Sequence, residues 1–319
     1  MRIGRNPEKK LQNKIIHKKH RIIIPVFIPK SDDVYYDNLF SVLKVSINSL
    51  IRTTNQTETN ISIINNNCRE EVTKYIDKLL DEKKIDKHVK LSVNYGKVYT
   101  ILSEAKASYE QLITIADADV FYFSNWFNET LTVFNTYDKA GVVAPLPMPQ
   151  LAYYNNASLF LDKLLKIKKG KVISDNDLLL FEKSVNSKIS LKKHNWFKNQ
   201  LYLEKNKIQV CIGSGHFIAT YRKEVLDKIK VIKPIYKFED GAESFHLDHP
   251  IDKLGYYRLS TIKSYAYHLG NTIPKWVQDY DFGIIIPSEI NNKTKRLKTY
   301  FPYKFKEIIS KIYRKFTII

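Results

Sequence analysis

LITIADAD, at residues 112–119, is the stretch that decides the fold. Its first five residues form a continuous apolar and β-branched run, which is typical of a strand buried on both faces of a sheet. Asp117 and Asp119 follow directly, and residues two apart in an extended chain point the same way. We therefore expect both carboxylates just beyond the carboxyl end of a buried strand, the edge at which open α/β sheets bind ligands.

Alternating strand and helix patterns lead up to this stretch from the amino-terminal side. Short apolar runs indicate strands, and apolar residues spaced by three or four indicate helices. The expected elements are a strand over 21–28, a helix through 39–50 with Asp37 as its N-cap, a strand over 61–64, a helix over 69–84, a strand over 89–93 and a helix over 98–110. This alternation predicts an α/β fold with a doubly wound, mainly parallel sheet.

The second half of the chain has a less regular pattern. Residues 151–206 are predicted to be mainly helical and polar, with a solvated basic run at 163–171. The features expected after it are an apolar segment at 210–212, a small-residue cluster at 213–215, a helix over 221–229 and a strand from 258 that leads to 265–268. No internal repeat is visible.

Composition excludes several classes of protein. Of the 319 residues, 44% are hydrophobic, which is ordinary for a globular protein and excludes wholesale disorder. Cys68 and Cys211 provide neither a disulfide framework nor a four-thiolate zinc site, and so few cysteines fit a reducing cytosol. The longest apolar stretches, 22–29 and 283–287, are shorter than the roughly 20 residues of a spanning helix. The first lacks a small-residue cleavage site, so we expect a buried strand there instead of a secretory signal.

Positive charge is concentrated at the two ends of the chain. Of the net charge of +19, residues 1–21 supply +7, with eight basic residues and one acidic. Residues 291–319 supply +8, with nine and one, which leaves +4 for the rest. A nucleic-acid-binding protein would spread its charge over one folded face. Basic ends around a nearly neutral middle favour attachment to an anionic surface instead.

The paired aspartates at 117 and 119 indicate a metal site. Two adjacent carboxylates repel each other unless a cation or a shared proton relieves them. A hard divalent ion would do so and would leave coordination positions for a diphosphate. The alternative is a solvated aspartate pair that caps the next helix. The position directly after a buried strand favours the metal.

Several motifs between about residues 20 and 275 point to one family. They are Ile24-Pro25-Val26-Phe27, Ser49-Leu50, Asn94-Tyr95-Gly96-Lys97, Asp117-Ala118-Asp119 and His268-Leu269-Gly270-Asn271. Together they resemble a GT-A fold glycosyltransferase, most similar to the inverting family 2 enzymes of bacterial surface-glycan synthesis. The family's Asp-Asp-Gly-Ser after the second strand is replaced by Asn65-Asn66-Asn67-Cys68. This departure affects the nucleoside contact, because an amide both donates and accepts.

The resemblance implies a nucleotide-sugar donor, a UDP-sugar first, and a Mn²⁺ or Mg²⁺ ion. The donor-binding residues that it implies are Pro25, Phe27, Asn65, Asn66, Lys97, Asp117 and Ala118. The metal ligands that it implies are Asp117, Asp119 and His268. A lone histidine at a strand end is more often structural, and only its pairing with the aspartate motif favours ligation.

The resemblance also implies an inverting single displacement, in which a carboxylate takes the proton of the acceptor hydroxyl. The family places this base about a dozen residues before a Gly-Tyr pair, here Gly255-Tyr256. That spacing puts Glu243 first, followed by Asp248 and then Asp240. For each of the three, ordinary surface charge in a loop is the alternative.

Acceptor-binding residues are implied in the same way. They are Gly213, Ser214, Gly215 and His216. Small residues in this loop would let a sugar approach the backbone, and a plain tight turn is the alternative. Trp276 is a further candidate because a tryptophan can stack on a sugar, and an ordinary core position is the alternative. Trp276 lies in a proline-containing loop that could close on the donor.

An amphipathic helix is predicted beyond Pro302. Its apolar face would carry Phe305, Ile308, Ile309, Ile312 and Phe316, and another face Lys304, Lys311 and Lys315. Such a helix suits an anionic membrane interface, where each Lys or Arg contributes about 1 kcal/mol. In the alternative, the apolar face packs on the catalytic domain.

We expect a basic arm at 1–20, a GT-A catalytic domain at 21–290 and a basic membrane-associating tail at 291–319. Within the domain, the nucleotide-sugar half would cover about 21–150 and the acceptor half about 151–290. The expected function is sugar transfer to a glycan or lipid-linked acceptor in bacterial cell-surface polysaccharide synthesis, at the inner face of the cytoplasmic membrane. A retaining enzyme is one alternative, because 268–276 loosely resembles a loop of retaining family 8. The other is a nucleic-acid-binding protein, which the uneven charge disfavours.

Overall fold

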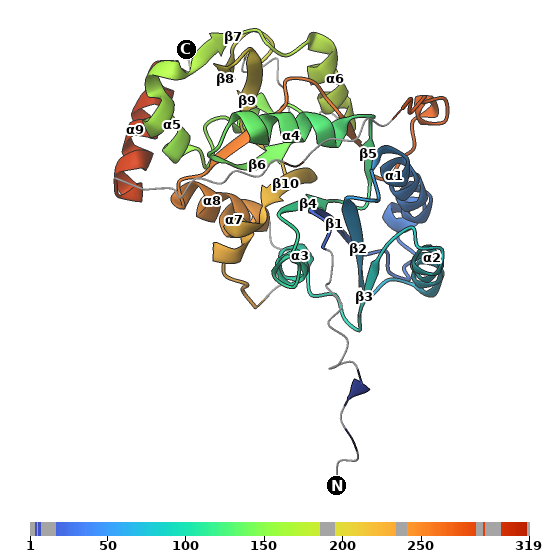
Figure 1. The fold of residues 1–319 in the computed structure, drawn as a ribbon. Coiled ribbons are helices and arrows are strands. Elements are labelled where there is room, and N and C mark those ends of the chain that lie inside the picture. Colours follow the sequence, from blue (N-terminus) through green and yellow to red (C-terminus); the bar gives the residue numbers. More distant parts are fainter. Residues whose placement is uncertain are drawn as a thin grey trace.

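A computed structural model describes residues 17–185, 195–233, 241–284 and 301–317, together with residues 4, 6, 7 and 290. Within these residues a ten-stranded sheet forms the centre of the fold (Figure 1). In spatial order its strands are β3 (Lys87–Leu91), β2 (Thr59–Asn66), β1 (His20–Val26), β4 (Leu112–Ala116), β10 (Ile218–Arg222), β6 (Ala140–Ala144), β11 (Tyr257–Ser260), β9 (Ile208–Ile212), β8 (Gln200–Lys205) and β7 (Lys168–Gly170). A small second sheet pairs β5 (Val120–Tyr122) with β12 (Ala266–His268).

The amino-terminal half of the large sheet is parallel. Strand β1 lies in its middle, where Ile22 is level with Ile61 of β2 and with Thr114 of β4. Strand β10 runs antiparallel to both β4 and β6, whereas β6 and β11 are parallel. Strands β9, β8 and β7 extend the sheet in antiparallel fashion. The predicted α/β class is confirmed, and so is the buried strand at 112–116.

Helices cover both faces of this sheet (Figure 1). They are α1 (Leu39–Thr53), α2 (Glu70–Asp81), α3 (Lys97–Lys106), α4 (Trp126–Thr136), α5 (Ala157–Lys163), α6 (Asp175–Ser184), α7 (Lys223–Lys228), α8 (His249–Lys253) and α9 (Tyr303–Thr317). Shorter helical turns are η2 (Val34–Tyr36), η3 (Pro149–Leu151), η4 (Leu164–Lys166), η5 (Ser244–Asp248) and η6 (Lys275–Val277).

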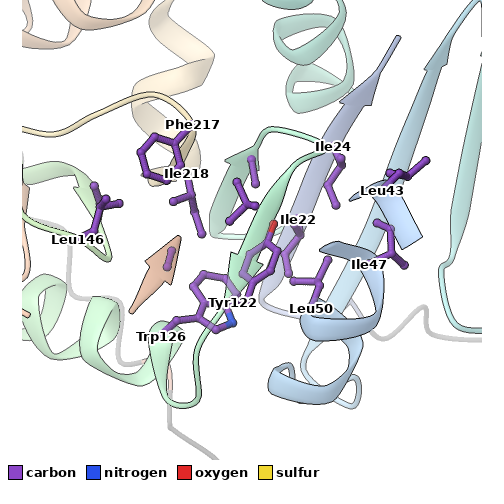
Figure 2. Close-up of a cluster of buried hydrophobic side chains, with 14 of the residues drawn as sticks. Ile22, Ile24, Leu43, Ile47, Leu50, Tyr122, Trp126, Leu146, Phe217 and Ile218 are labelled. Atoms are coloured by element: carbon purple, nitrogen blue, oxygen red, sulfur yellow. The ribbon is translucent and has the colours of Figure 1, made fainter. Parts of the chain in front are cut away.

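The continuous apolar run of β1 is explained by burial on both faces of the strand. Ile22 and Ile24 pack against α1, whose Leu43 and Ile47 follow helical spacing, as Figure 2 shows. Ile23 points to the opposite face, where α3 and α7 pack. Burying an isoleucine side chain fully contributes about 1.5–3 kcal/mol, so β1 anchors both helical layers.

Some predicted boundaries and elements were wrong. Asp37 does not cap α1: the N-cap position is Asn38, and Asp37 instead ends the turn η2. The prediction of mainly helix over 151–206 omitted β7 and β8. Strand β7 is a short edge strand with two exposed lysines, so it lacks the apolar alternation that reveals a strand. The helix expected from Tyr221 begins at Lys223, because residues 218–222 form the buried strand β10.

Helix α9 packs against α5, where the ring centroid of Tyr313 lies 5.0 Å from that of Phe160. Lys306 is buried and donates to Ser158 Oγ at 3.1 Å, and the Tyr303 hydroxyl donates to Asp252 at 2.8 Å. Phe305, Ile308 and Ile312 are exposed and Ile309 is half-buried, so the alternative in which the whole apolar face packs on the domain is wrong. The side chain of Phe316 lies outside the described part. In the described ranges, every helix is too short or too polar to cross a bilayer.

Candidate active site

Two carboxylates and an imidazole meet at the carboxyl end of β4. Asp117 and Asp119 follow β4, and the backbone N–H of Asp117 donates to the Phe217 carbonyl at 2.8 Å. The antiparallel pair β5 and β12 brings His268 across from Val120. One ligand atom from each of Asp117, Asp119 and His268 lies within 4.8 Å of the other two. The three predicted metal ligands are therefore together.

This donor set fits a divalent cation. Among the described residues, the buried Asp119 Oδ1 has no hydrogen-bond partner, so one oxygen is free to bind. His268 Nε2 lies 3.1 Å from the other oxygen, Asp119 Oδ2. Burial acts to lower the pKa of His268, but the hydrogen bond and charge of Asp119 outweigh it and raise the pKa to about 9. Because ligands must be deprotonated, binding of a metal here would release this proton.

Lys97 connects the metal ligands to a candidate base. It is the first residue of α3, and Gly96 before it has a φ of 77°, a conformation that glycine adopts without strain. The Lys97 ammonium pairs with Asp117 and lies 3.1 Å from Glu243 Oε1. Burial acts to raise the pKa of Glu243, but Lys97 outweighs it and holds the pKa below its ordinary value.

Asp117 has the opposite shift. Burial raises the pKa of this carboxyl, and the neighbouring charge of Asp119 adds to the effect, whereas Lys97 opposes it. Desolvation and the like charge of Asp119 therefore both disfavour the ionised form of Asp117, and an added cation would relieve both effects. A bound cation would therefore lower the pKa of Asp117.

A pocket opens beside the aspartates at the ends of β1, β2 and β4. The lining residues are Pro25, Val26, Phe27, Ile28, Tyr35, Tyr36, Leu39, Val42, Asn66, Asn94, Gly96, Lys97, Asp117, Ala118 and Asp119. Of the predicted donor-binding residues, only Asn65 is absent from this wall. Its amide accepts from the Cys68 N–H at 2.8 Å and donates to Thr73 at 2.8 Å. Asn65 thus holds the turn after β2.

Asn66 and Asn94 face each other in the pocket wall. The Tyr95 N–H donates to Asn66 Oδ1 at 2.9 Å, and the Gly96 N–H donates to Asn94 Oδ1 at 2.8 Å. These backbone donors fix both amide orientations, and Asn66 Nδ2 donates to Asn94 Oδ1 at 2.7 Å. Where the resemblance implies a carboxylate, this chain therefore has an amide whose oxygen already has a partner.

Tyr35 and Tyr36 are pocket residues that the sequence prediction missed. They lie in η2, which Asp33 caps by accepting from the Tyr35 N–H at 2.9 Å. Both rings line the pocket together with Asp117 and Asp119. The available signal in the sequence was the run Asp33-Val34-Tyr35-Tyr36, which comes soon after the first strand.

Asp248 is held in a different environment from Glu243. Its side chain is only 4% exposed and lies 2.6 Å from Arg258 Nη2, with His216 Nε2 3.1 Å away. Arg258 is 1% exposed and also donates to the Ser214 carbonyl at 2.5 Å. Asp248 thus joins β11 to the loop at 213–216. The third candidate base, Asp240, lies outside the described residues.

The predicted acceptor residues are divided between two places. Gly213, Ser214, Gly215 and His216 lie next to Asp248, where Ser214 is buried. A Cβ on Gly213, whose φ is 112°, would lie 3.0 Å from backbone of η3, so packing within the protein already requires glycine. Trp276 is absent from the pocket wall and packs edge-on against Phe121, with ring centroids 5.5 Å apart.

Comparisons with known proteins give one family. A sequence profile described as "Glycosyl transferase family 2" matches residues 34–230, more than half of the chain. No curated protein matches. Among solved structures, the chain is similar to Staphylococcus aureus TarS 1–349, with 14% identity and a TM-score of 0.45. It is also similar to the mannosyltransferase PcManGT from Pyrobaculum calidifontis in complex with GDP-Man and Mn²⁺, with 8% identity and a TM-score of 0.45. Both alignments cover 78% of this chain, but only 60% of the first structure and 55% of the second.

Proposed function

The chain belongs to glycosyl transferase family 2, and on that premise we propose that it transfers a sugar from a nucleotide-sugar donor to an acceptor hydroxyl. The observation that carries this proposal is the arrangement of charged groups at one end of the pocket. Asp117, Asp119 and His268 lie together, and Glu243 is joined to Asp117 through Lys97. A UDP-sugar is the first donor to test.

The metal-binding residues of this proposal are Asp117, Asp119 and His268. Carboxylate oxygens with one imidazole suit Mn²⁺ well and Mg²⁺ less well. When bound, such an ion supplies positive charge against the negative charge that develops on a departing diphosphate. Lys97 would add a second positive charge at the same end of the pocket.

Glu243 is the residue that we assign as the base. Its carboxylate is ionised at neutral pH and can accept a proton, and loss of the contact with Lys97, which lowers its pKa, would make it a stronger base. In a single displacement the acceptor oxygen bonds to the anomeric carbon as the bond from that carbon to the diphosphate oxygen breaks. The hydroxyl proton passes to Glu243, and the configuration at the anomeric carbon inverts. Asp248 is less suited, because Arg258 and His216 already engage it.

We further propose that the acceptor is carried at an anionic membrane surface, on the cytoplasmic side, as in bacterial cell-surface polysaccharide synthesis. Helix α9 supports this: Phe305, Ile308 and Ile312 are exposed on a helix that also carries exposed lysines. Exposed apolar side chains beside basic ones are the pattern of helices that lie in a membrane interface. The basic sequence ends add charge of the same sign.

Donor turnover tests the proposed activity. The full chain is incubated with a panel of nucleotide sugars, with Mn²⁺, Mg²⁺ or a chelator, and hydrolysis or transfer is followed by mass spectrometry. We expect one donor class to be consumed in a metal-dependent way, and Asp119→Ala to abolish consumption. Asp175→Ala, at an exposed aspartate of α6, should leave it unchanged.

Two results would contradict this proposal. If no nucleotide sugar is turned over, the proposed transferase activity is contradicted. If Asp119→Ala turns the donor over normally, the proposed metal site is contradicted. NMR of the product then gives the anomeric configuration. An inverted product supports Glu243 as a base in a single displacement, whereas a retained product would favour the retaining alternative.

A further inference from the structure

One ammonium group joins two halves of the candidate site that are far apart in sequence. Lys97 Nζ contacts Asp117 from the end of β4 and lies 3.1 Å from Glu243 at the start of η5. The proposed function gives these carboxylates different tasks, metal binding and proton transfer. The Lys97 side chain is about a quarter exposed, so it has room to change partners.

Each carboxylate of the cluster already has another side chain of the protein as its partner. Lys97 pairs with Asp117 and Glu243, and His268 pairs with Asp119. A divalent cation that binds Asp117 meets an ammonium group already in contact with the same carboxylate. Because like charges repel strongly at such short range, Lys97 must oppose metal binding while it remains there.

A bound nucleoside diphosphate changes this balance. Lys97 and Asp117 line the same pocket, so a diphosphate bound beside the aspartates would lie within reach of the ammonium. Phosphate oxygens are strong acceptors for lysine, and the lysine stem is flexible. The ammonium can therefore exchange a carboxylate partner for a phosphate partner, and its positive charge remains paired with a negative group. That exchange frees both Asp117 and Glu243.

We propose that Lys97 is a positioning residue that couples metal binding to nucleotide binding and keeps the base engaged until the donor is present. The proposal rests on the function proposed above. Without nucleotide, Lys97 holds Asp117 and Glu243 and weakens the site for a divalent cation. With nucleotide, it moves to the diphosphate, the metal binds more tightly, and Glu243 becomes available to the acceptor. By linkage, metal and nucleotide then raise each other's affinity by the same factor.

Mn²⁺ binding to the full chain tests this coupling directly. Free Mn²⁺ is measured by electron paramagnetic resonance, with and without UDP and, separately, GDP. For the unmodified chain we expect a nucleotide to tighten Mn²⁺ binding by about tenfold or more, within the usual range of coupling between sites. Lys97→Met, which keeps the stem and removes the charge, should bind Mn²⁺ about tenfold more tightly without nucleotide and gain less from it.

Two further variants separate coupling from structural support. Lys97→Arg keeps the positive charge and should retain most of the coupling. Lys87→Met is the matched control. Lys87, the first residue of strand β3, pairs with the buried Glu104 at 2.7 Å and does not line the pocket. It should leave both Mn²⁺ affinities unchanged. Thermal melting of each variant shows whether it is folded.

The outcomes distinguish this inference from the proposed function. If the unmodified chain binds Mn²⁺ in neither condition, the metal site and the coupling both fail. If it binds Mn²⁺ but Lys97→Met has unchanged or weaker affinity without nucleotide, only the coupling fails. Tighter Mn²⁺ binding by Lys97→Met together with a smaller nucleotide effect supports the inference.

Discussion

At Glu243 and Asp248, two acids five residues apart meet opposite local conditions. Glu243 borders the pocket residues through Lys97 and has a lowered pKa. Asp248 is almost completely buried and pairs with the equally buried Arg258. Losing one partner of a buried ion pair leaves an uncompensated charge, which is costly. We therefore propose a chemical task for the Glu243 carboxylate, whereas the Asp248 carboxylate is engaged in a buried ion pair.

We predict that Glu243→Gln lowers kcat by a factor of about 10²–10⁴ while donor binding persists, because only the proton acceptor is lost. Asp248→Asn should instead lower the free energy of unfolding by about 3–5 kcal/mol, because Arg258 keeps its buried charge. Steady-state kinetics, calorimetric donor binding and urea unfolding measure these effects. A greater loss of kcat in Asp248→Asn at unchanged stability would identify Asp248 as the base instead.

Among the elements, α9 shows most clearly how packing selects a helix face. Asp252 is completely buried and accepts from the N–H groups of Ala157 and Ser158 at 2.8 Å, at the beginning of α5. The Tyr303 hydroxyl donates to the same carboxylate, so one side chain joins α5, α8 and α9. The docked helix leaves Phe305, Ile308 and Ile312 exposed.

We predict that the full chain binds vesicles that contain an anionic lipid and not vesicles of phosphatidylcholine alone. Replacing Phe305, Ile308 and Ile312 together by serine should reduce binding at least about tenfold, because each buried apolar side chain contributes about 1.5–3 kcal/mol. Co-flotation measures the bound fraction. Leu165→Ser, at an almost fully exposed leucine of η4, is the control. Equal binding by the triple variant would exclude α9 as the attachment.

For the molecule as a whole, stability depends on the centre of the sheet, where His20 is completely buried in β1. Its ring nitrogens lie 3.1 Å from Thr59 Oγ1 and 2.7 Å from Thr114 Oγ1, and the ring stacks on Phe127. Burial lowers the pKa of His20 to about 3. The folded chain therefore keeps this ring neutral at pH values where an unfolded histidine is protonated.

This shift predicts a pH-dependent loss of stability. The unfolded chain binds a proton below pH 6.5 and the folded chain only near pH 3, so the contribution of His20 is complete above pH 6.5 and decreases as the pH falls. The slope is at most about 1.4 kcal/mol per pH unit. Urea unfolding at pH 7, 6 and 5 should show that the stability advantage over His20→Gln shrinks with falling pH. A constant difference would contradict the buried neutral ring.

Much of the amino-terminal half was predictable because its signals are local. The strand at 112–116 was predicted with its observed bounds, and helical spacing identified α1 through Leu43 and Ile47. Parallel strands buried on both faces have continuous apolar runs, and the helices between them have a clear 3.6-residue period. The antiparallel strands β7, β8 and β10 were missed, because they are short or partly polar, and because β7 and β10 pair with strands that are distant in sequence.

By itself, the sequence determined the α/β class, the aspartates at the end of a buried strand, and the excess of charge at both ends of the chain. Only the tertiary structure decided that Lys97 contacts Glu243, that Asp248 is engaged by Arg258, and that Ile308 and Ile312 of α9 stay exposed. The physical reason is the separation in sequence between the residues that interact. Strand and helix periodicity depend on neighbours in sequence, whereas ion pairs and helix docking depend on groups that only the folded sheet brings together.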